Sequence, residues 1–207
     1  MTGKALITGA GQRLGREMAL FLARRGYDVA VHYATSAAEA EAVAKHARAL
    51  GVTAATLQAD LLDESATEDL VGRASQALGG PLTVLVNNAS IFEYDTIHTA
   101  TADSWDRHIG SNLRAPFILT QAFAAQAPAA STDARGEPLA TGLVVNMVDQ
   151  RVRKLTPEFM TYTIAKMGLW AMTQTTAQAL APAIRVNAIG PGPTCKAIAR
   201  LPNILND

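Results

Sequence analysis

Two side chains that could transfer a proton lie four residues apart. Tyr162 and Lys166 fall within a predicted helix over Phe159–Leu180, so they share one helix face. A tyrosine with an ordinary pKa of about 10 is a poor acid at neutral pH, and a neighbouring ammonium stabilises the phenolate and lowers that pKa toward the working range. Asp149 precedes Tyr162 by thirteen residues and follows a predicted strand, either as a third participant or as a loop cap. These residues indicate acid–base chemistry.

A glycine-rich turn near the N-terminus could hold a pyrophosphate. The run Thr8–Gly15 (TGAGQRLG) follows a predicted strand and opens a predicted helix. Its glycines let the backbone approach a phosphate whose charge faces the helix N-terminus. The third glycine, Gly15, stands one position later than in the strict G-x-G-x-x-G pattern, and a purely steric need for glycine in a tight turn is the alternative.

The end of the second predicted strand distinguishes between the two nicotinamide cofactors. An NAD site usually has an acidic residue there for the ribose hydroxyl. Here no acid follows Tyr33, and Asp28 lies at the wrong end of the strand. His32, the Ser36 hydroxyl and the following backbone amides could approach a 2′-phosphate, with Arg13 across the same groove. The pattern favours NADP(H), unless His32 is an ordinary strand residue and Ser36 only a helix cap.

Polar residues also follow the third and fourth predicted strands. Asp60 follows the third strand, and Asn87, Asn88 and Ser90 follow the fourth. Paired asparagines can cross-link neighbouring strand ends through their amides, or border a flat ligand. Phe92 comes next, either as part of a pocket floor or as an ordinary core residue.

The elements that must position these residues alternate between short apolar strands and helices, which predicts an α/β fold with a right-handed, doubly wound parallel sheet. The spacing of Ser36 and Glu39 predicts a capping box, and Pro128–Thr141 is typical of a surface excursion. The predicted strands are Lys4–Thr8, Asp28–Tyr33, Thr53–Asp60, Leu82–Asn87, Gly142–Met147 and Ile184–Ile189. The predicted helices are Arg13–Arg25, Ala37–Leu50, Glu64–Leu78, Ala102–Gln126 and Phe159–Leu180.

Composition narrows the class of protein. The chain has 207 residues, of which 49% are hydrophobic and 17% charged, so intrinsic disorder is excluded. Basic and acidic residues number 18 each, and a net charge of zero gives no long-range attraction to nucleic acid or to a membrane. The single cysteine, Cys195, fits a reducing compartment. We expect a cytoplasmic protein that binds a small molecule and no metal ion.

The combined motifs resemble the short-chain dehydrogenase/reductases over Lys4 to about Thr194. The resemblance rests on Thr8–Gly15, Asp60, Asn87-Asn88-Ala89, Asn112, Tyr162 with Lys166, and Pro191-Gly192. It implies a Rossmann-type fold and hydride transfer with Tyr162 as proton donor, Lys166 holding the nicotinamide ribose, and Asn112 carrying a proton-relay water. The implied cofactor contacts are Gly9, Arg13, Leu14, His32, Tyr33, Ser36, Asp60, Leu61, Asn88, Ala89, Ser90, Met147, Tyr162, Lys166, Pro191 and Gly192.

Two departures from the general family pattern resemble its pteridine reductase branch. Arg13 stands where most members have glycine, and Asp149 where most have serine. A serine hydroxyl can donate to a ketone oxygen, whereas an ionised aspartate cannot and would repel a developing alkoxide. The resemblance implies NADPH-dependent reduction of a pterin-type C=N bond. Phe92 and the nicotinamide would sandwich the pterin, Ser90 and Arg13 would contact its polar edge, and Asp149 with Tyr162 would orient it.

Other readings of the sequence stay open. Thr35 replaces the branch's usual arginine, which leaves the 2′-phosphate to His32, Ser36 and backbone amides. A carbonyl reductase or dehydrogenase acting on a ketone or 3-oxoacyl substrate is one alternative, and an inactive nucleotide-binding form is another.

The C-terminal part of the sequence departs from the family. We expect residues 1–194 to form the dinucleotide-binding catalytic domain, with the family's seventh strand and last helix missing and an atypical tail over 195–207. We also expect a homo-oligomer that associates through the long helices, as a dimer rather than a tetramer.

Overall fold

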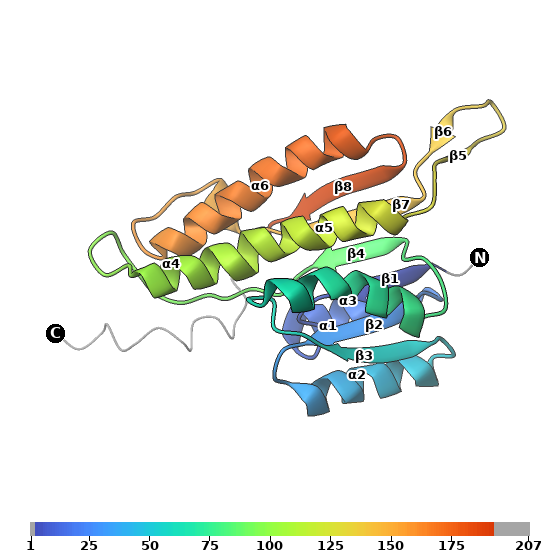
Figure 1. Cartoon of the computed structure of the whole chain (residues 1–207), viewed down its shortest axis with the longest axis horizontal. Helices are drawn as coiled ribbons and strands as arrows, with labels where there is room; N and C mark the ends of the chain where they lie inside the picture. The colour runs from blue at the N-terminus through green and yellow to red at the C-terminus, as the bar shows by residue number, and fades with distance from the viewer. Residues whose placement is uncertain (1–2, 193–207) are drawn as a thin grey trace.

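The protein is built around a six-stranded parallel β-sheet, and the computed structural model describes residues 3–192. The strand order is β3-β2-β1-β4-β7-β8 (Figure 1). This order confirms the predicted Rossmann-type α/β fold, while the tail predicted over 195–207 lies outside the described residues. The strands are β1 (Lys4–Ile7), β2 (Asp28–Tyr33), β3 (Ala54–Gln58), β4 (Val84–Asn87), β7 (Gly142–Met147) and β8 (Ile184–Ile189), and each corresponds to a predicted strand.

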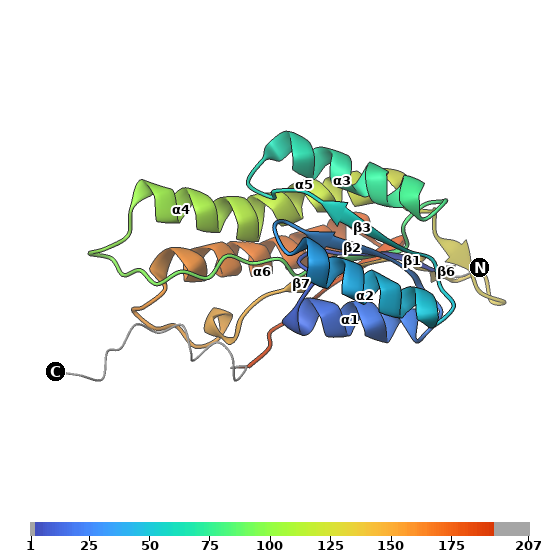
Figure 2. The ribbon, with the colours of Figure 1, turned by 90° about the horizontal axis from the view of Figure 1, so that it is seen from below.

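Helices cover both faces of the sheet, as a doubly wound topology requires. The helices α1 (Arg13–Ala23) and α2 (Ala37–Ala49) pack on one face, and α3 (Glu64–Ala77), α5 (Ala115–Gln126) and α6 (Met160–Leu180) pack on the other. Figure 2 shows α1 and α2 on the side of the sheet opposite α3 and α5. Because both faces are covered, most strands are largely apolar with polar groups near their ends. The edge strand β8 differs, because exposed Arg185 and Asn187 alternate with its buried residues.

The helix predicted over Ala102–Gln126 is interrupted. It begins as α4 (Ala102–Ile109), passes through a π-helical turn over Gly110–Arg114 and continues as α5. Pro116, in the first turn of α5, has no backbone N–H and cannot bond the carbonyl four residues earlier, that of Asn112. The predicted helical bounds are confirmed, and the π-helical turn within them falls at a residue of the predicted site.

The capping box predicted at α2 does not form. Ser36 is the N-cap residue, as expected, but its side chain makes no capping hydrogen bond. Glu39 instead accepts a hydrogen bond from Gln12 Nε2 at 3.1 Å, across the gap between α1 and α2. A capping box does occur at α4, where Thr101 and Ser104 bond each other's backbone N–H.

The predicted surface excursion over Pro128–Thr141 contains a short antiparallel hairpin, β5 (Ser131–Thr132) with β6 (Pro138–Leu139). Within residues 3–192, no helix is long and apolar enough to cross a membrane. Those residues also contain no group of three or more side chains that could hold a metal ion.

Candidate active site

The predicted site residues lie at the carboxyl edge of the sheet, where the strand order reverses between β1 and β4. The Thr8 hydroxyl accepts the backbone N–H of Asn88 at 2.9 Å, and the Asn88 side chain donates to the carbonyls of Thr8 and Gly9 at 2.8 and 3.1 Å. Asn87 donates to the Asn146 side chain on β7 at 2.8 Å. The asparagine pair therefore cross-links the strand ends, as one of its two interpretations proposed.

The glycine turn brings its backbone into close contact with its neighbours. Gly9 has a positive φ of 61°, which favours glycine. A Cβ at Gly15 would lie 2.3 Å from the Gly9 carbonyl oxygen, and one at Gly11 would lie 2.9 Å from Ser36 Oγ. The turn therefore packs against α1 and the start of α2 with no room for side chains at these positions.

The N-termini of α1 and α2 both lack a side-chain cap. Neither Gln12 before α1 nor Ser36 before α2 makes a capping hydrogen bond, and the first turn of α1 contains no acidic residue. By contrast, Asp63 caps α3 by accepting the Ala66 N–H at 3.1 Å. Uncapped N-termini beside the glycine turn leave backbone donors and the positive ends of two helix dipoles for an anionic ligand.

Arg13 adopts a backbone conformation that other side chains rarely take. Its φ is 51°, in the left-handed region where glycine is favoured, and its side chain is exposed at the start of α1. A non-glycine residue held there costs about 1 kcal/mol or more, and such residues cluster at functional sites. The replacement of the usual glycine by Arg13 therefore needs a compensating role.

His32 lies in β2 as predicted, but its side chain does not face the expected position of the 2′-phosphate. The side chain is buried, with Nδ1 accepting the Gly9 N–H at 3.0 Å and Nε2 lying 3.1 Å from the Ala59 carbonyl oxygen. Burial lowers the pKa of His32 to about 4, so the imidazole is neutral. Both ring nitrogens are already bonded, so the predicted contact with a 2′-phosphate is wrong, and His32 supports the glycine turn instead.

Tyr162, Asp149 and Lys166 meet behind the end of β7. The Tyr162 hydroxyl donates to Asp149 Oδ2 at 3.2 Å. Asp149 Oδ1 accepts the backbone N–H of Arg151 at 2.8 Å, at the start of a 3₁₀ turn over Gln150–Val152. Lys166 Nζ donates to the Met147 carbonyl at 2.8 Å. Sequence reasoning therefore placed the acid and the tyrosine side by side correctly.

The pKa of Tyr162 shifts in the direction opposite to the prediction. Burial raises it most. The adjacent Asp149 carboxylate raises it further, because its negative charge disfavours the phenolate and because it accepts a hydrogen bond from the phenol. The Lys166 ammonium bonds Met147 and lies 5.6 Å from the centre of the tyrosine ring. Burial lowers the pKa of Lys166 itself to about 8. Tyr162 is thus held protonated, and its raised pKa makes it a weaker acid than an ordinary tyrosine.

The Asn112 side chain has a structural task. It is fully buried in the π-helical turn, accepts the Ile91 N–H at 2.9 Å and donates to the Ile91 carbonyl at 2.8 Å. Both ends of the amide are therefore engaged with the loop after β4. Because the side-chain amide is engaged in this way, the predicted water relay at Asn112 stays a prediction.

An aromatic group adjoins Tyr162. Phe92 stacks on Phe159, with ring centroids 4.3 Å apart and 7° between the ring planes, and meets Tyr162 edge-to-face at 4.7 Å. The Arg151 guanidinium lies 4.7 Å from the Phe159 ring centre and 3.6 Å from Asp149 Oδ1. Sequence reasoning missed Phe159 and Arg151. Their spacing was the available signal, because Phe159 precedes Tyr162 by three residues and Arg151 follows Asp149 by two.

The other predicted residues lie at the same edge. The Leu61 side chain is buried in the apolar core, which leaves its backbone for a ligand contact, and Asp60 accepts the Leu62 N–H at 3.0 Å. Leu14 lies in the first turn of α1. The remainder occupy the ends of strands or the segments directly after them: Tyr33, Ala89, Ser90, Met147, Pro191 and Gly192.

A sequence model described as short chain dehydrogenase matches residues 3–200. The chain belongs to the short-chain dehydrogenase family. The Staphylococcus aureus (strain Mu50) 3-oxoacyl-[acyl-carrier-protein] reductase FabG is 34% identical over 193 residues, which are 93% of this chain and 74% of that protein. A Picea abies short-chain type dehydrogenase/reductase is 31% identical, with 91% and 69% covered.

Solved structures of short-chain dehydrogenases superpose closely on the chain. FolM alternative dihydrofolate reductase 1 from Brucella suis, in complex with NADP, has a TM-score of 0.84 and 41% identity over 97% of this chain and 80% of its own. A short chain dehydrogenase from Burkholderia cenocepacia J2315, also with NADP, has a TM-score of 0.83 and 33% identity, covering 92% and 74%. These matches confirm the predicted class, an NADP-dependent oxidoreductase, at the level of the short-chain dehydrogenase family.

Proposed function

We propose that this short-chain dehydrogenase reduces a pterin-type C=N bond with NADPH, and that residues 1–194 act as one dinucleotide-binding catalytic domain. The observation that carries the proposal is the hydrogen bond from the Tyr162 hydroxyl to Asp149 Oδ2. A carboxylate at this position accepts hydrogen bonds and cannot donate one to a ketone oxygen. The amino and N–H groups of a pterin are hydrogen-bond donors, so a pterin can bond the Asp149 carboxylate.

The residues present fit a phosphorylated dinucleotide. The glycine turn and the uncapped start of α1 suit a pyrophosphate, and the uncapped start of α2 with Ser36 suits a 2′-phosphate. No acidic residue stands between Tyr33 and Ser36 to repel that phosphate or to bond an unmodified ribose. Lys166 supplies the cation for the nicotinamide ribose. When bound, NADPH supplies a hydride and leaves as NADP⁺.

The side chains of the site then complete the reduction. The hydride adds to the carbon of the C=N bond, and the π electrons of that bond pass to the nitrogen. Tyr162 transfers its proton to that nitrogen, which completes the N–H bond. A water molecule held beside Asn112 then returns a proton from solvent to the phenolate, whose negative charge the Lys166 ammonium stabilises. Asp149 orients the donor edge of the ring. Phe92 provides an apolar face for it, and Ser90 and Arg13 approach its polar edge.

A 3-oxoacyl reductase is the second candidate. The identity of 34% with FabG over 93% of the chain favours it, because the name of that relative specifies a 3-oxoacyl substrate. Asp149 argues against it, since an ionised carboxylate beside Tyr162 would repel the alkoxide that forms from a ketone.

One enzymatic comparison separates the two candidates. NADPH oxidation is followed with dihydrofolate, with dihydrobiopterin and with a 3-oxoacyl thioester. We expect turnover with a dihydropterin, and we expect Asp149→Ser to shift the ratio of kcat/KM values toward the thioester by about 10- to 100-fold. Asp69→Ser, on the exposed face of α3, is the matched control. Turnover of the thioester alone by the unmodified chain rejects the pterin proposal.

Association through the long helices is also proposed. Trp105 on α4 and Phe117 on α5 are exposed by 44% and 47%, which suits a surface that pairs with a second copy. Sedimentation of the purified chain measures this, and we expect a dimer.

A further inference from the structure

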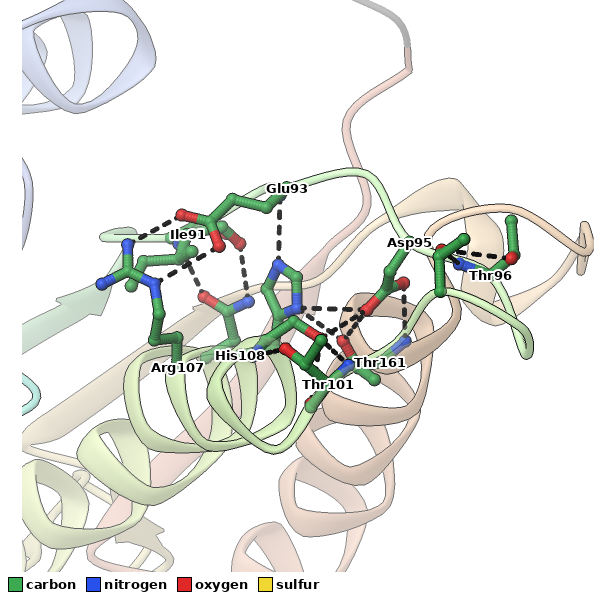
Figure 3. A network of polar contacts seen from close by, with 12 residues as sticks. Ile91, Glu93, Asp95, Thr96, Thr101, Arg107, His108 and Thr161 are labelled. Atoms are coloured by element: carbon green, nitrogen blue, oxygen red, sulfur yellow. Dashed lines mark hydrogen bonds and ion pairs between the residues drawn. The ribbon is translucent and has the colours of Figure 1, made fainter.

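Figure 3 shows a network of polar contacts in which His108, Thr161 and Asp95 form a buried hydrogen-bond chain. His108 on α4 is fully buried, with Nδ1 2.6 Å from Thr161 Oγ1 and Nε2 3.1 Å from the backbone nitrogen of Glu93. The Thr161 hydroxyl also bonds Asp95 Oδ2, and the Thr161 N–H donates to Asp95 Oδ1 at 3.2 Å. The chain thus joins the loop after β4, helix α4 and the first turn of α6.

The direction of every hydrogen bond in this chain is fixed by chemistry. The backbone N–H of Glu93 can only donate, so Nε2 of His108 must accept. In a neutral imidazole the proton then lies on Nδ1, which donates to Thr161 Oγ1, and the Thr161 hydroxyl donates to the Asp95 carboxylate. Burial lowers the pKa of His108, which favours this neutral form.

Two members of this hydrogen-bond chain are sequence neighbours of residues of the candidate active site. Glu93 follows Phe92, and Thr161 precedes Tyr162. The Asp95 carbonyl accepts the N–H of Phe159 at 2.7 Å, and the His108 ring meets Tyr162 edge-to-face with centroids 5.9 Å apart. The chain therefore bonds the backbone beside both the proton donor and the aromatic face.

The groups of the chain are not placed to act on a substrate. His108 has no exposed surface, and Asp95 and Thr161 are each exposed by only 2%. Glu93, the most exposed member, is engaged by Arg107 in an ion pair at 2.7 Å. Their effect on a reaction must therefore pass through Tyr162 and Phe92.

We propose that His108, Thr161 and Asp95 are positioning residues that hold Tyr162 and Phe92 at a fixed separation, so that proton donation and ring stacking act on one bound molecule. This role rests on the proposed function insofar as Tyr162 is the proton donor. The proposal adds that one hydrogen-bond chain, in which each bond has a single possible direction, sets the positions of both Tyr162 and Phe92. A displacement of about 1 Å between reacting groups costs about 100-fold in rate, so such a device has a measurable effect.

The first test measures the tautomer of His108 in the unmodified full chain. Imidazole nitrogen shifts in ¹⁵N-labelled protein distinguish the two neutral tautomers, and single substitutions assign the four histidines. We expect the proton of His108 on Nδ1. His32 is an internal reference of opposite type, because its Nδ1 accepts the Gly9 N–H and its Nε2 donates to the Ala59 carbonyl. A proton on Nε2 of His108, or an imidazolium at neutral pH, overturns the proposal.

The second test removes the central hydroxyl. Thr161→Val breaks the hydrogen-bond chain, and Thr161→Ser keeps the hydroxyl. Thr163→Val is the control, because the buried Thr163 hydroxyl has no hydrogen-bond partner within residues 3–192. We expect Thr161→Val to lower kcat and raise the substrate KM by about tenfold each, with the Kd for NADPH unchanged. Thr161→Ser should restore both parameters, and Thr163→Val should change neither. Equal kinetics for the two valine variants overturn the proposal.

The tests separate this proposal from the proposed function. The kinetic constants are measured with dihydrofolate, dihydrobiopterin and a 3-oxoacyl thioester. Reduction of the thioester alone rejects the pterin substrate, yet the Thr161 variants still test positioning, because Tyr162 also donates to a ketone. If Thr161→Val does not fold, the tautomer of His108 in the unmodified protein still tests the hydrogen-bond directions on which the proposal depends.

Discussion

The cofactor side and the substrate side of the candidate active site are each anchored by a buried histidine, and the two histidines are bonded in opposite ways. His32 accepts a backbone N–H through Nδ1 and ties the glycine turn to the end of β3. His108 accepts one through Nε2 and ties the loop after β4 to α6 through Thr161. The first contact joins backbone to backbone within the sheet, whereas the second needs side chains from three elements. Both sides are thus fixed by contacts between residues far apart in the sequence, but the cofactor side depends on one side chain and the substrate side on three.

The two sides also share one device. Arg13 on the cofactor side and Phe159 on the substrate side are the non-glycine residues with positive φ within residues 3–192, at 51° and 56°. Each stands at the start of a helix that carries site residues. Both conformations cost free energy, and Phe159 is compensated by the hydrogen bond of its N–H to Asp95. Strain at both helix starts indicates that side-chain placement there matters more than local stability.

The largest expected effect lies on the substrate side. Tyr162→Phe removes the proton donor and should lower kcat by about 1000-fold, while the Kd for NADPH changes little. Stopped-flow measurement of NADPH oxidation and a fluorescence titration give the two values. Activity within tenfold of the unmodified chain would mean that another group donates the proton.

A large effect on cofactor binding is expected at the glycine turn. Gly15→Ala places a Cβ 2.3 Å from the Gly9 carbonyl oxygen, so the turn must separate from α1, and the Kd for NADPH should rise by about 100-fold, or about 3 kcal/mol. Gly72→Ala is the control, because a Cβ at this position on α3 meets nothing within 4 Å. Equal Kd values for the two variants would contradict the role of the turn.

The pH dependence of kcat/KM tests the role of the Lys166 ammonium, which lies between the cofactor side and the substrate side. Because burial lowers its pKa to about 8, the ammonium is lost as the pH rises above that value, and kcat/KM should fall by up to about tenfold per pH unit. Lys166→Arg should remove this alkaline limb, whatever its absolute activity. The unfolded chain binds this proton more tightly, so the free energy of unfolding should rise between about pH 8 and 10.5. A flat profile in the unmodified chain would exclude this assignment.

The smallest expected effect concerns the strain at Arg13. Arg13→Gly should raise the free energy of unfolding by about 1 kcal/mol or less, because glycine tolerates the positive φ but costs chain entropy. Arg24→Gly, at a position with ordinary helical φ, should lower it slightly. Chemical denaturation measures both changes. If both variants lose the same stability, the conformation of Arg13 is not strained.

Local pattern predicted most of the fold and part of the site. The six strands, the glycine turn and the Tyr162–Lys166 pair follow from periodicity and short spacings, which tertiary contacts did not override. Periodicity predicts the helical bounds Ala102–Gln126. It does not predict the π-helical turn over Gly110–Arg114, which precedes Pro116 in the first turn of α5. Ser36 was predicted as a capping residue from spacing alone, while Gln12 competes for the Glu39 partner that a capping box needs.

The sequence by itself determined which residues could do chemistry, because tyrosine, lysine, aspartate and the glycines have their properties wherever they stand. Tertiary structure decided their states. Whether His32 faces a phosphate or the core depends on residues on other strands, and whether Tyr162 is held protonated depends on burial and on Asp149. The chain from His108 to Asp95 joins residues up to 66 positions apart, and no local pattern predicts such contacts.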